Sequence, residues 1–181
     1  MKSTTLAGRV CQLPPYSIVL VAGEDAFGSD TSRVQANLFP PRPHLTLWYP
    51  PYAAAQPQLD PSGLYRVATS QFKEKEFAVI TMDLVSLGLE KGGAYTLDLT
   101  ARSQPDSGLA VKLPDARQHK DVFVPLGTNA MPLRFDFNYD RALNDGQIKF
   151  VLTRDAIGRG AEFTFEDFRL SKWTPRGQVE K

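Results

Sequence analysis

The sequence contains few of the residues that cross-link a fold or bind a metal. Among its 181 residues are one cysteine and two histidines. The single Cys11 excludes an internal disulfide and a zinc site built from several thiolates. A lone thiol also fits a reducing compartment better than a secreted protein. A chain of this length buries about 70% of the surface that its unfolded form exposes, so it needs neither a disulfide nor a structural metal.

Long apolar segments are also missing. The longest apolar run, residues 18–22, is far shorter than the roughly 20 residues with which a helix crosses a membrane. The first residues, MKSTTLAGRVCQL, contain no apolar segment of the length found in secretion signals. We therefore expect no membrane partner, and synthesis in the cytoplasm without a signal peptide. Secretion is the alternative if a signal was removed.

No excess charge of one sign is present. The chain has 21 basic and 20 acidic residues; residues 1–90 carry 7 and 8 of them, and residues 91–181 carry 14 and 12. Proteins that bind nucleic acids neutralise phosphates with clustered lysine and arginine. Because neither half has such a cluster, we expect no nucleic-acid partner.

Catalytic signatures are absent from the sequence. It contains no Gly-x-Ser-x-Gly elbow, Walker loop or Gly-x-Gly-x-x-Gly motif. His44 and His119 have no histidine partner two or four residues away, so a zinc site is not predicted. We expect no enzymatic activity, no cofactor and no catalytic or metal-binding residues.

Two groups of acidic residues leave alternatives open. Asp98 and Asp136 form either a glycosidase-like carboxylate pair or, the favoured interpretation, cross-strand ion pairs with nearby arginines. Residues 140–145 hold carboxylates and an amide that could wrap a cation. Their spacing matches no calcium loop, and turn hydrogen bonds explain them as well.

Prolines are concentrated in one segment. Seven of the fourteen prolines fall between Pro40 and Pro61. Because proline fixes φ and lacks a backbone donor, we expect residues 36–62 to form an extended, largely polyproline-like arm that is neither helix nor central strand. The whole chain, residues 1–181, is predicted to be a single domain with this arm and a C-terminal tail at residues 174–181.

Aromatic residues are the candidate partner-binding residues of the arm and the tail. They are Phe39, Trp48, Tyr49, Tyr52 and Trp173. Protein interfaces are enriched in tryptophan and tyrosine, and sugars stack on exposed rings. Core packing is the alternative for Trp48. Trp173 follows the last apolar residue of the final predicted strand, where it would hold the tail against a neighbour.

Alternation of apolar and polar residues dominates the second half. Residues 95–102, 133–140 and 148–152 each place apolar side chains on one face and polar ones on the other, as antiparallel sheets do. Residues 77–85 are apolar on both faces near their start, which indicates a central strand. These patterns predict an all-β fold, an antiparallel two-sheet β-sandwich of the jelly-roll type.

Turn and parity signals predict two local features. Asp145-Gly146 predicts a hairpin that joins residues 133–139 to residues 147–153. Phe163 and Phe165 have one parity, whereas Phe168 and Leu170 have the other. One extra residue near Glu166-Asp167 would keep all four on the core, so a β-bulge is predicted there.

Residues 93–173 resemble carbohydrate-binding modules with a jelly-roll fold. AYTLDLTARS (94–103) resembles their "YTLSFWAR"-like strand, and the Phe135/Phe137 strand resembles the one that follows a tryptophan-containing turn. FTFEDFRLSKW (163–173) is similar to their closing strand, with Glu166-Asp167 at the acidic pair. The resemblance implies a jelly roll and binding of a polysaccharide by aromatic stacking. The opening Asn-Gly-x-Phe-Glu strand, with its structural calcium site, is absent.

The same sandwich builds many virus and phage particles. A cysteine-poor, all-β chain with a proline arm looks like a virion accessory protein, such as a capsid decoration protein or a tail or fibre adaptor. Our leading hypothesis is a non-catalytic virion component that docks through its arm onto other structural subunits, or onto further copies of itself, within an oligomeric assembly. The alternative is a carbohydrate-binding module with a glycan partner.

Overall fold

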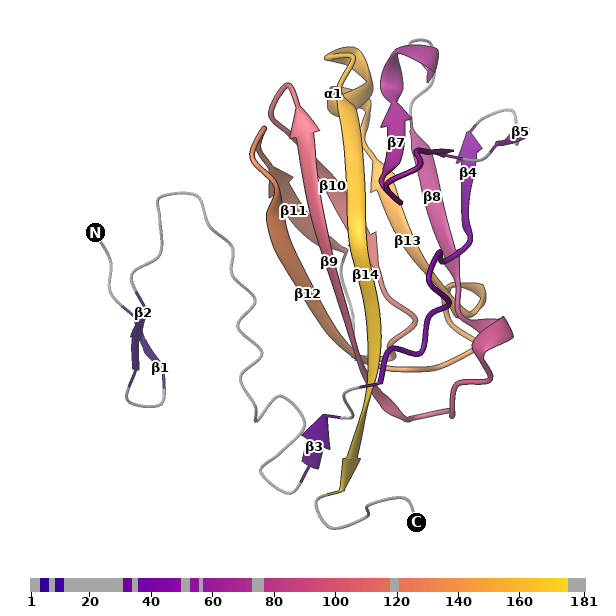
Figure 1. Cartoon of the computed structure of the whole chain (residues 1–181), viewed down its shortest axis with the longest axis vertical. Coiled ribbons are helices and arrows are strands. Elements are labelled where there is room, and N and C mark those ends of the chain that lie inside the picture. The colour runs from indigo at the N-terminus through magenta and orange to yellow at the C-terminus, as the bar shows by residue number, and fades with distance from the viewer. Residues whose placement is uncertain are drawn as a thin grey trace.

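The fold is a two-layered antiparallel β-sandwich, as the alternation predicts (Figure 1). The computed structural model describes residues 4–6, 9–11, 31–33, 36–49, 53–55, 57–72, 77–117 and 121–175. Within these residues no helix has the length and apolar character needed to cross a membrane. Tyr52, His119 and residues 176–181 lie outside the described residues.

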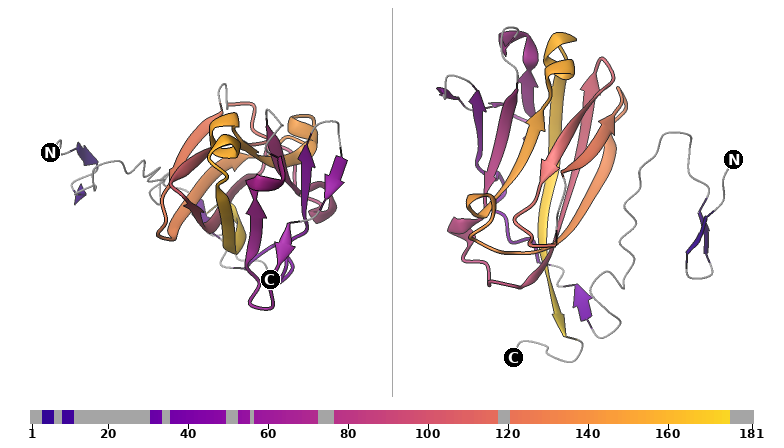
Figure 2. Two further views of the ribbon diagram at one scale, coloured as in Figure 1. Left: turned by 90° about the horizontal axis from the view of Figure 1, so that it is seen from above. Right: turned by 180° about the vertical axis from the view of Figure 1, so that it is seen from behind.

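One layer, the β8 sheet, has six strands among the described residues. In spatial order they are β11 (Val122–Leu126), β10 (Ser107–Lys112), β13 (Gln147–Leu152), β8 (Ala78–Asp83), β4 (Leu45–Tyr49) and β5 (Ala53–Ala55). Strand β8 pairs with a neighbour on each side, which confirms the central strand expected there. The right panel of Figure 2 shows the molecule from the side of this sheet.

The other layer, the β9 sheet, has β14 at its centre. Its order is β12 (Met131–Asn138), β9 (Ala94–Gln104), β14 (Glu162–Pro175), β7 (Tyr65–Ala68) and β6 (Gln58–Leu59). Strand β3 (Thr31–Arg33) pairs with the far end of β14, past the body of the sandwich (Figure 1). Strands β1 (Thr4–Leu6) and β2 (Arg9–Cys11) pair with each other.

Short helical turns connect these strands. They are η1 (Thr69–Phe72), η2 (Val85–Leu87), η3 (Asn144–Gly146) and α1 (Arg154–Gly158). Thr153 caps α1, because its hydroxyl accepts a hydrogen bond from Ala156 N at 3.4 Å.

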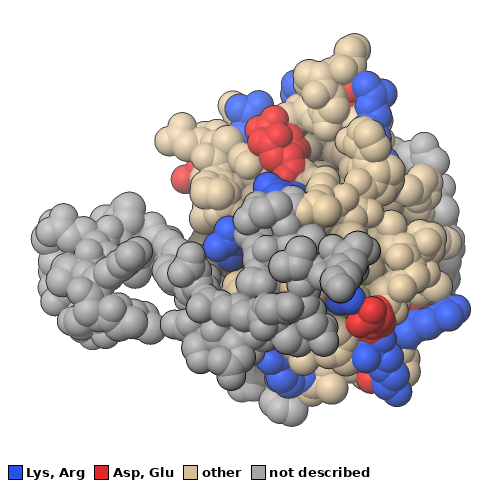
Figure 3. Space-filling model, turned by 60° about the horizontal axis from the view of Figure 1, so that its bottom comes forward, with Lys and Arg blue, Asp and Glu red and all other residues tan. Residues whose placement is uncertain are grey.

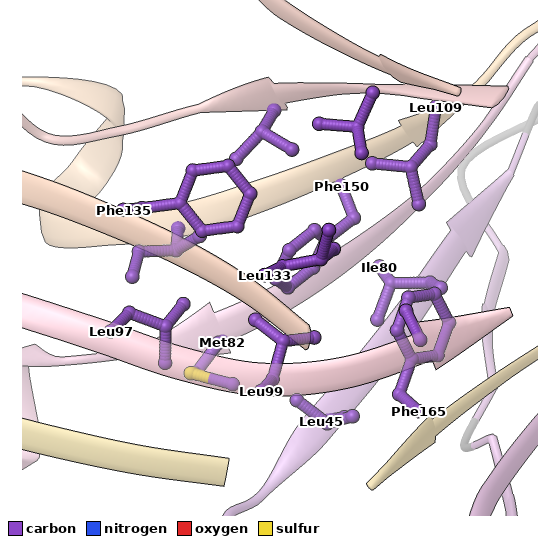
Figure 4. Packing of buried hydrophobic residues seen from close by; sticks show 14 of the residues in the cluster. Leu45, Ile80, Met82, Leu97, Leu99, Leu109, Leu133, Phe135, Phe150 and Phe165 are labelled. Carbon is purple, nitrogen blue, oxygen red and sulfur yellow. The ribbon is translucent and has the colours of Figure 1, made fainter. Parts of the chain in front are cut away.

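The core lies between the two sheets, where the inward side chains of both meet (Figure 4). Leu97, Leu99 and Phe135 of the β9 sheet point toward Ile80 and Phe150 of the β8 sheet. Along β13 and β8 the buried and half-buried residues alternate for most of the strand. This period of two places every second side chain on an outer face.

The proline-rich segment departs from the expectation that it contains no central strand. Residues Leu45–Tyr49 form β4, which lies between β8 and β5, and Leu45 and Leu47 are buried in the core. The physical reason is the position of the prolines. Pro43 and Pro50 flank a run of six residues without proline, residues 44–49, and every residue of that run has a backbone donor for the sheet.

The predicted bulge is confirmed in β14. The register with β9 shifts between Glu166 and Arg169, and Asp167 has a positive φ of 58°. Phe163, Phe165, Phe168 and Leu170 are all buried as a result. The extra residue therefore shifts the side-chain parity of the second half of the strand by one, which keeps its apolar side chains directed at the core.

The predicted hairpin between β12 and β13 is wrong. Strand β12 pairs with β9 in one sheet, whereas β13 pairs with β8 and β10 in the other. The residues between them cross from one layer to the other. Asn144, Asp145 and Gly146 all have positive φ, and the Asn144 amide donates to Leu113 O at 2.6 Å. These residues do turn the chain, but they form an arch between layers instead of a tight hairpin.

Candidate binding face

One row of residues crosses all six strands of the β8 sheet on its outer face. From β5 to β11, successive Cα partners are Ala54, Trp48, Val79, Val151, Ala110 and Phe123. Val79, Val151 and Ala110 each lie between two buried core residues of their own strand, so the pleat directs them outward. All six residues are apolar by type, although this face is turned away from the core. We call them the apolar row.

The exposed aromatic side chains gather on this face. Trp48 is 42% exposed and Phe123 is 54% exposed, and they stand near opposite ends of the apolar row. Phe77, one residue before β8 and of the same parity as Val79, is 42% exposed. Among the described side chains, these three are the only aromatic ones that are large, apolar and exposed. An exposed apolar patch of this kind marks a binding surface more often than an isolated exposed residue does.

A polar row runs beside the apolar row on the same face. Its Cα partners are Thr46, Thr81, Lys149 and Lys112. Both lysines have carboxylate partners: Lys112 Nζ lies 3.4 Å from Asp121 Oδ2, and Lys149 Nζ lies 2.7 Å from Asp145 Oδ2. The hydrogen bond from Lys149 holds the pKa of the Asp145 carboxyl below its ordinary value. Thr81 is buried, so the Thr46 hydroxyl and two charge-paired ammonium groups line the apolar row.

The outer face of the β9 sheet has a different character, because its polar groups bond to one another. Arg134 Nε donates to Asp98 Oδ1 at 2.7 Å, and Arg102 Nε donates to Thr164 Oγ1 at 3.0 Å. Arg134 and Asp98 are direct cross-strand partners. Asp98 therefore forms a cross-strand ion pair, as the favoured interpretation expects.

Asp136 on that face has its own hydrogen-bond partner. Trp173 Nε1 donates to Thr96 Oγ1 at 2.8 Å, and the same hydroxyl donates to Asp136 Oδ1. Thr96 and the neighbouring Ser171 are fully buried. Asp98 and Asp136 thus bond to separate partners within the sheet.

The predicted partner-binding residues lie in different environments. Phe39 is 7% exposed and belongs to the core, and Tyr49 is partly buried against it. Trp48 is exposed on the outer face of the β8 sheet, whereas Trp173 is half-buried over the β9 sheet. The structure therefore does not bring them together in one patch.

The candidate cation ligands between β12 and β13 make turn hydrogen bonds. Asp140 Oδ1 accepts from Ala142 N at 2.9 Å, and the Asn144 amide donates to the main chain at 2.6 Å. Asp145 pairs with Lys149. No group of three or more potential metal ligands occurs in the described part of the chain.

At the end of the sandwich shown in Figure 3, basic and acidic side chains are intermixed.

Phe77 and Phe123 are the exposed aromatic residues of this face that the sequence patterns do not identify. Each lies in a short stretch that is apolar on both parities, FAVI and VFVPL. Alternation alone does not tell which parity of such a stretch faces the core. Pairing with neighbouring strands supplies that information, because Phe123 is the partner of Ala110 and shares its outward direction.

The similarities of this chain to known proteins are similarities of structure. No protein-family model matches the chain, and no curated protein matches it in sequence. Among solved structures it is similar to a family 4 carbohydrate-binding module, with 14% identity over 71% of this chain and 94% of that chain and a TM-score of 0.47. The second N-terminal cellulose-binding domain of Cellulomonas fimi β-1,4-glucanase C is 16% identical over 78% and 98%, with a TM-score of 0.44. A family 29 module complexed with cellulohexaose is 11% identical over 82% and 94%, also with a TM-score of 0.44.

Proposed function

We propose that this protein is a non-catalytic binding module that holds a polysaccharide chain on the outer face of the β8 sheet. The gathering of Trp48, Phe77 and Phe123 on one face carries this proposal. The face of an aromatic ring has a negative quadrupole, and the C–H bonds on the flat side of a sugar ring are apolar and slightly positive. Stacking therefore satisfies both partners without removing the sugar hydroxyls from water.

The dimensions of the face favour a chain over a single sugar. Trp48 and Phe123 lie on strands β4 and β11, four strand spacings apart, or about 19 Å. One sugar ring cannot contact both aromatic side chains across that distance. Several linked sugars can contact both while the intervening apolar row forms the floor.

The polar row favours an uncharged ligand. Lys112 and Lys149 are each paired with a carboxylate, so the face offers hydrogen-bond donors without a net positive field. Thr46 adds a hydroxyl group on the same row, whereas the Thr81 hydroxyl is buried and donates to Thr46 O at 3.4 Å. Sugar hydroxyls bond to such groups, whereas a polyanion would need unpaired cations.

The test is affinity electrophoresis or calorimetry against soluble neutral polysaccharides, including hydroxyethylcellulose, xylan and mixed-linkage glucan, with alginate as the acidic comparison. Trp48→Ala is expected to weaken binding about three- to tenfold, the loss of one stacking contact. Leu59→Ala is the matched control, since Leu59 is 39% exposed but lies on β6 of the other sheet.

The two tryptophans report on different faces. In a Trp173→Phe variant Trp48 is the only indole of the chain, and its emission should change on adding a bound glycan. Absence of binding to every polysaccharide of the panel would overturn the proposal, as would equal losses in Trp48→Ala and Leu59→Ala.

A second candidate is docking of structural subunits, as in a virion component. Leu38, 37% exposed, and Trp48 both lie in the segment of residues 36–49 and favour it. This candidate predicts that the purified protein self-associates, or binds a partner subunit, through these two residues. A monomer in analytical ultracentrifugation whose glycan affinity depends on Trp48 would favour the polysaccharide over the subunit.

A further inference from the structure

The side chain of Phe123 leans over the neighbouring strand, where Gly108 makes room for it. A Cβ atom built on Gly108 would lie 2.4 Å from Cζ and 2.9 Å from Cε2 of the Phe123 ring. Both distances are shorter than real Cβ contacts ever are. The tip of the ring therefore occupies the space that any other residue at position 108 would fill with its side chain.

Gly108 does not need to be glycine for its backbone conformation. It is absent from the glycines of positive φ and lies within β10, paired with Pro125 of β11. A glycine inside a strand weakens it and marks close approach of another group. Here that group is the tip of the Phe123 ring, a residue that is 54% exposed.

We propose that Gly108 is a positioning residue of the binding face, which holds the Phe123 ring down against the sheet as the second stacking position, opposite Trp48. This inference rests on the proposed polysaccharide binding. A ring that stands upright would offer its edge to a sugar and block the strip between the two aromatic side chains. A ring laid over Gly108 offers its face and leaves the strip open.

The first test is independent of any ligand. Protons above the face of an aromatic ring are shifted upfield, so the Gly108 Hα resonances should lie upfield of their ordinary range in the NMR spectrum. Phe123→Leu, which removes the ring and keeps an apolar side chain, should return them to that range. Hα resonances that are ordinary in the wild type, or unchanged in Phe123→Leu, would overturn the proposed ring position.

The second test is a double-mutant cycle on polysaccharide affinity, with the ligand that the wild type binds best. Gly108→Ala and Phe123→Ala should each weaken binding about three- to tenfold. In the double variant Gly108→Ala should add nothing, because the ring on which it acts is gone. Gly127→Ala is the control, since the nearest atom to its added Cβ is Asp106 Oδ1 at 3.7 Å.

The outcomes separate the two proposals. Binding that depends on Trp48 but is unchanged in Gly108→Ala, or additive in the double variant, overturns the role of Gly108 and leaves the proposed function standing. A wild type that binds no polysaccharide overturns the proposed function itself. The added Cβ also meets Val124 O at 3.0 Å. If Gly108→Ala fails to fold, Phe123→Leu and Phe123→Ala decide, because an unchanged affinity in both overturns the second stacking position.

Discussion

The bulge in β14 leaves backbone groups that one side chain satisfies, and removing that side chain should destabilise the fold. The Asn37 amide nitrogen donates to Phe168 O at 3.2 Å. Its Oδ1 accepts from Leu170 N at 2.9 Å and from Phe39 N at 3.1 Å. Asn37 thereby replaces a neighbouring strand at the point where β7 no longer pairs with β14.

We expect Asn37→Ala to lower the free energy of unfolding by about 2 kcal/mol. Each intramolecular hydrogen bond contributes about 1 kcal/mol net, and three are lost. Asn37 is exposed at the surface, so water replaces part of what is lost. For a domain of this size the change corresponds to a fall of about 4 to 8 °C in Tm.

Urea unfolding followed by circular dichroism measures this change, with an unaltered m-value as the sign that the folded and unfolded states keep their surface areas. Asn129→Ala is the matched control, because Asn129 is an exposed residue in the bend before β12. If the two variants differ by less than about 0.5 kcal/mol, which is the range of ordinary surface substitutions, the reasoning on the bulge is refuted.

Three further predictions concern the ends and faces of the sandwich. Burial opposes ionisation of Asp115, but hydrogen bonds from Arg117 and Asn138 outweigh it and lower the pKa of its carboxyl. The stabilisation by this carboxylate is therefore present above about pH 4 and lost below. In Asp115→Asn the free energy of unfolding should fall less steeply as the pH is lowered through this range. Trp173→Phe should cost about 1 kcal/mol in urea unfolding through the lost bond to Thr96, with glycan affinity unchanged. Trp48→Thr should change stability by less than about 0.5 kcal/mol; a loss above 2 kcal/mol would mean that the ring belongs to the fold.

The parts of the fold that the sequence predicts are those in which each strand has one apolar and one polar face. Residues 95–102 and 133–138 carry this alternation and lie as expected in β9 and β12. The bulge at Asp167 was predictable for the same reason, because a change of parity with both sets apolar requires an inserted residue.

Strand partners were not predictable from these patterns. Asn144, Asp145 and Gly146 have the residue types of a hairpin turn, but the same backbone conformations carry the chain between layers. The distinction depends on which strands cover the edges of β12 and β13, and those strands, β9 and β8, are remote in sequence. Strand β4 was not predictable for a similar reason, because the average proline content of residues 36–62 conceals the proline-free residues 44–49.

The candidate site was only partly predictable for a related reason. The sequence indicates Trp48 as a candidate partner-binding residue, yet neither its outward direction nor its neighbours follow from local sequence. Residues from five strands of the β8 sheet come into one row with it only when the register is known. A site of this kind is assembled across strands, and no single segment carries its signature.

The contrast between the two outer faces explains why one of them is the better candidate for a ligand. On the β9 sheet, Arg134, Asp98, Arg102 and Thr164 bond across strands, so a ligand there would have to break existing bonds and would gain little. On the β8 sheet, Trp48 and Phe123 remain exposed although polar side chains at both positions would leave the core intact. Because water solvates apolar rings poorly, covering them with a sugar ring releases free energy that the opposite face cannot supply.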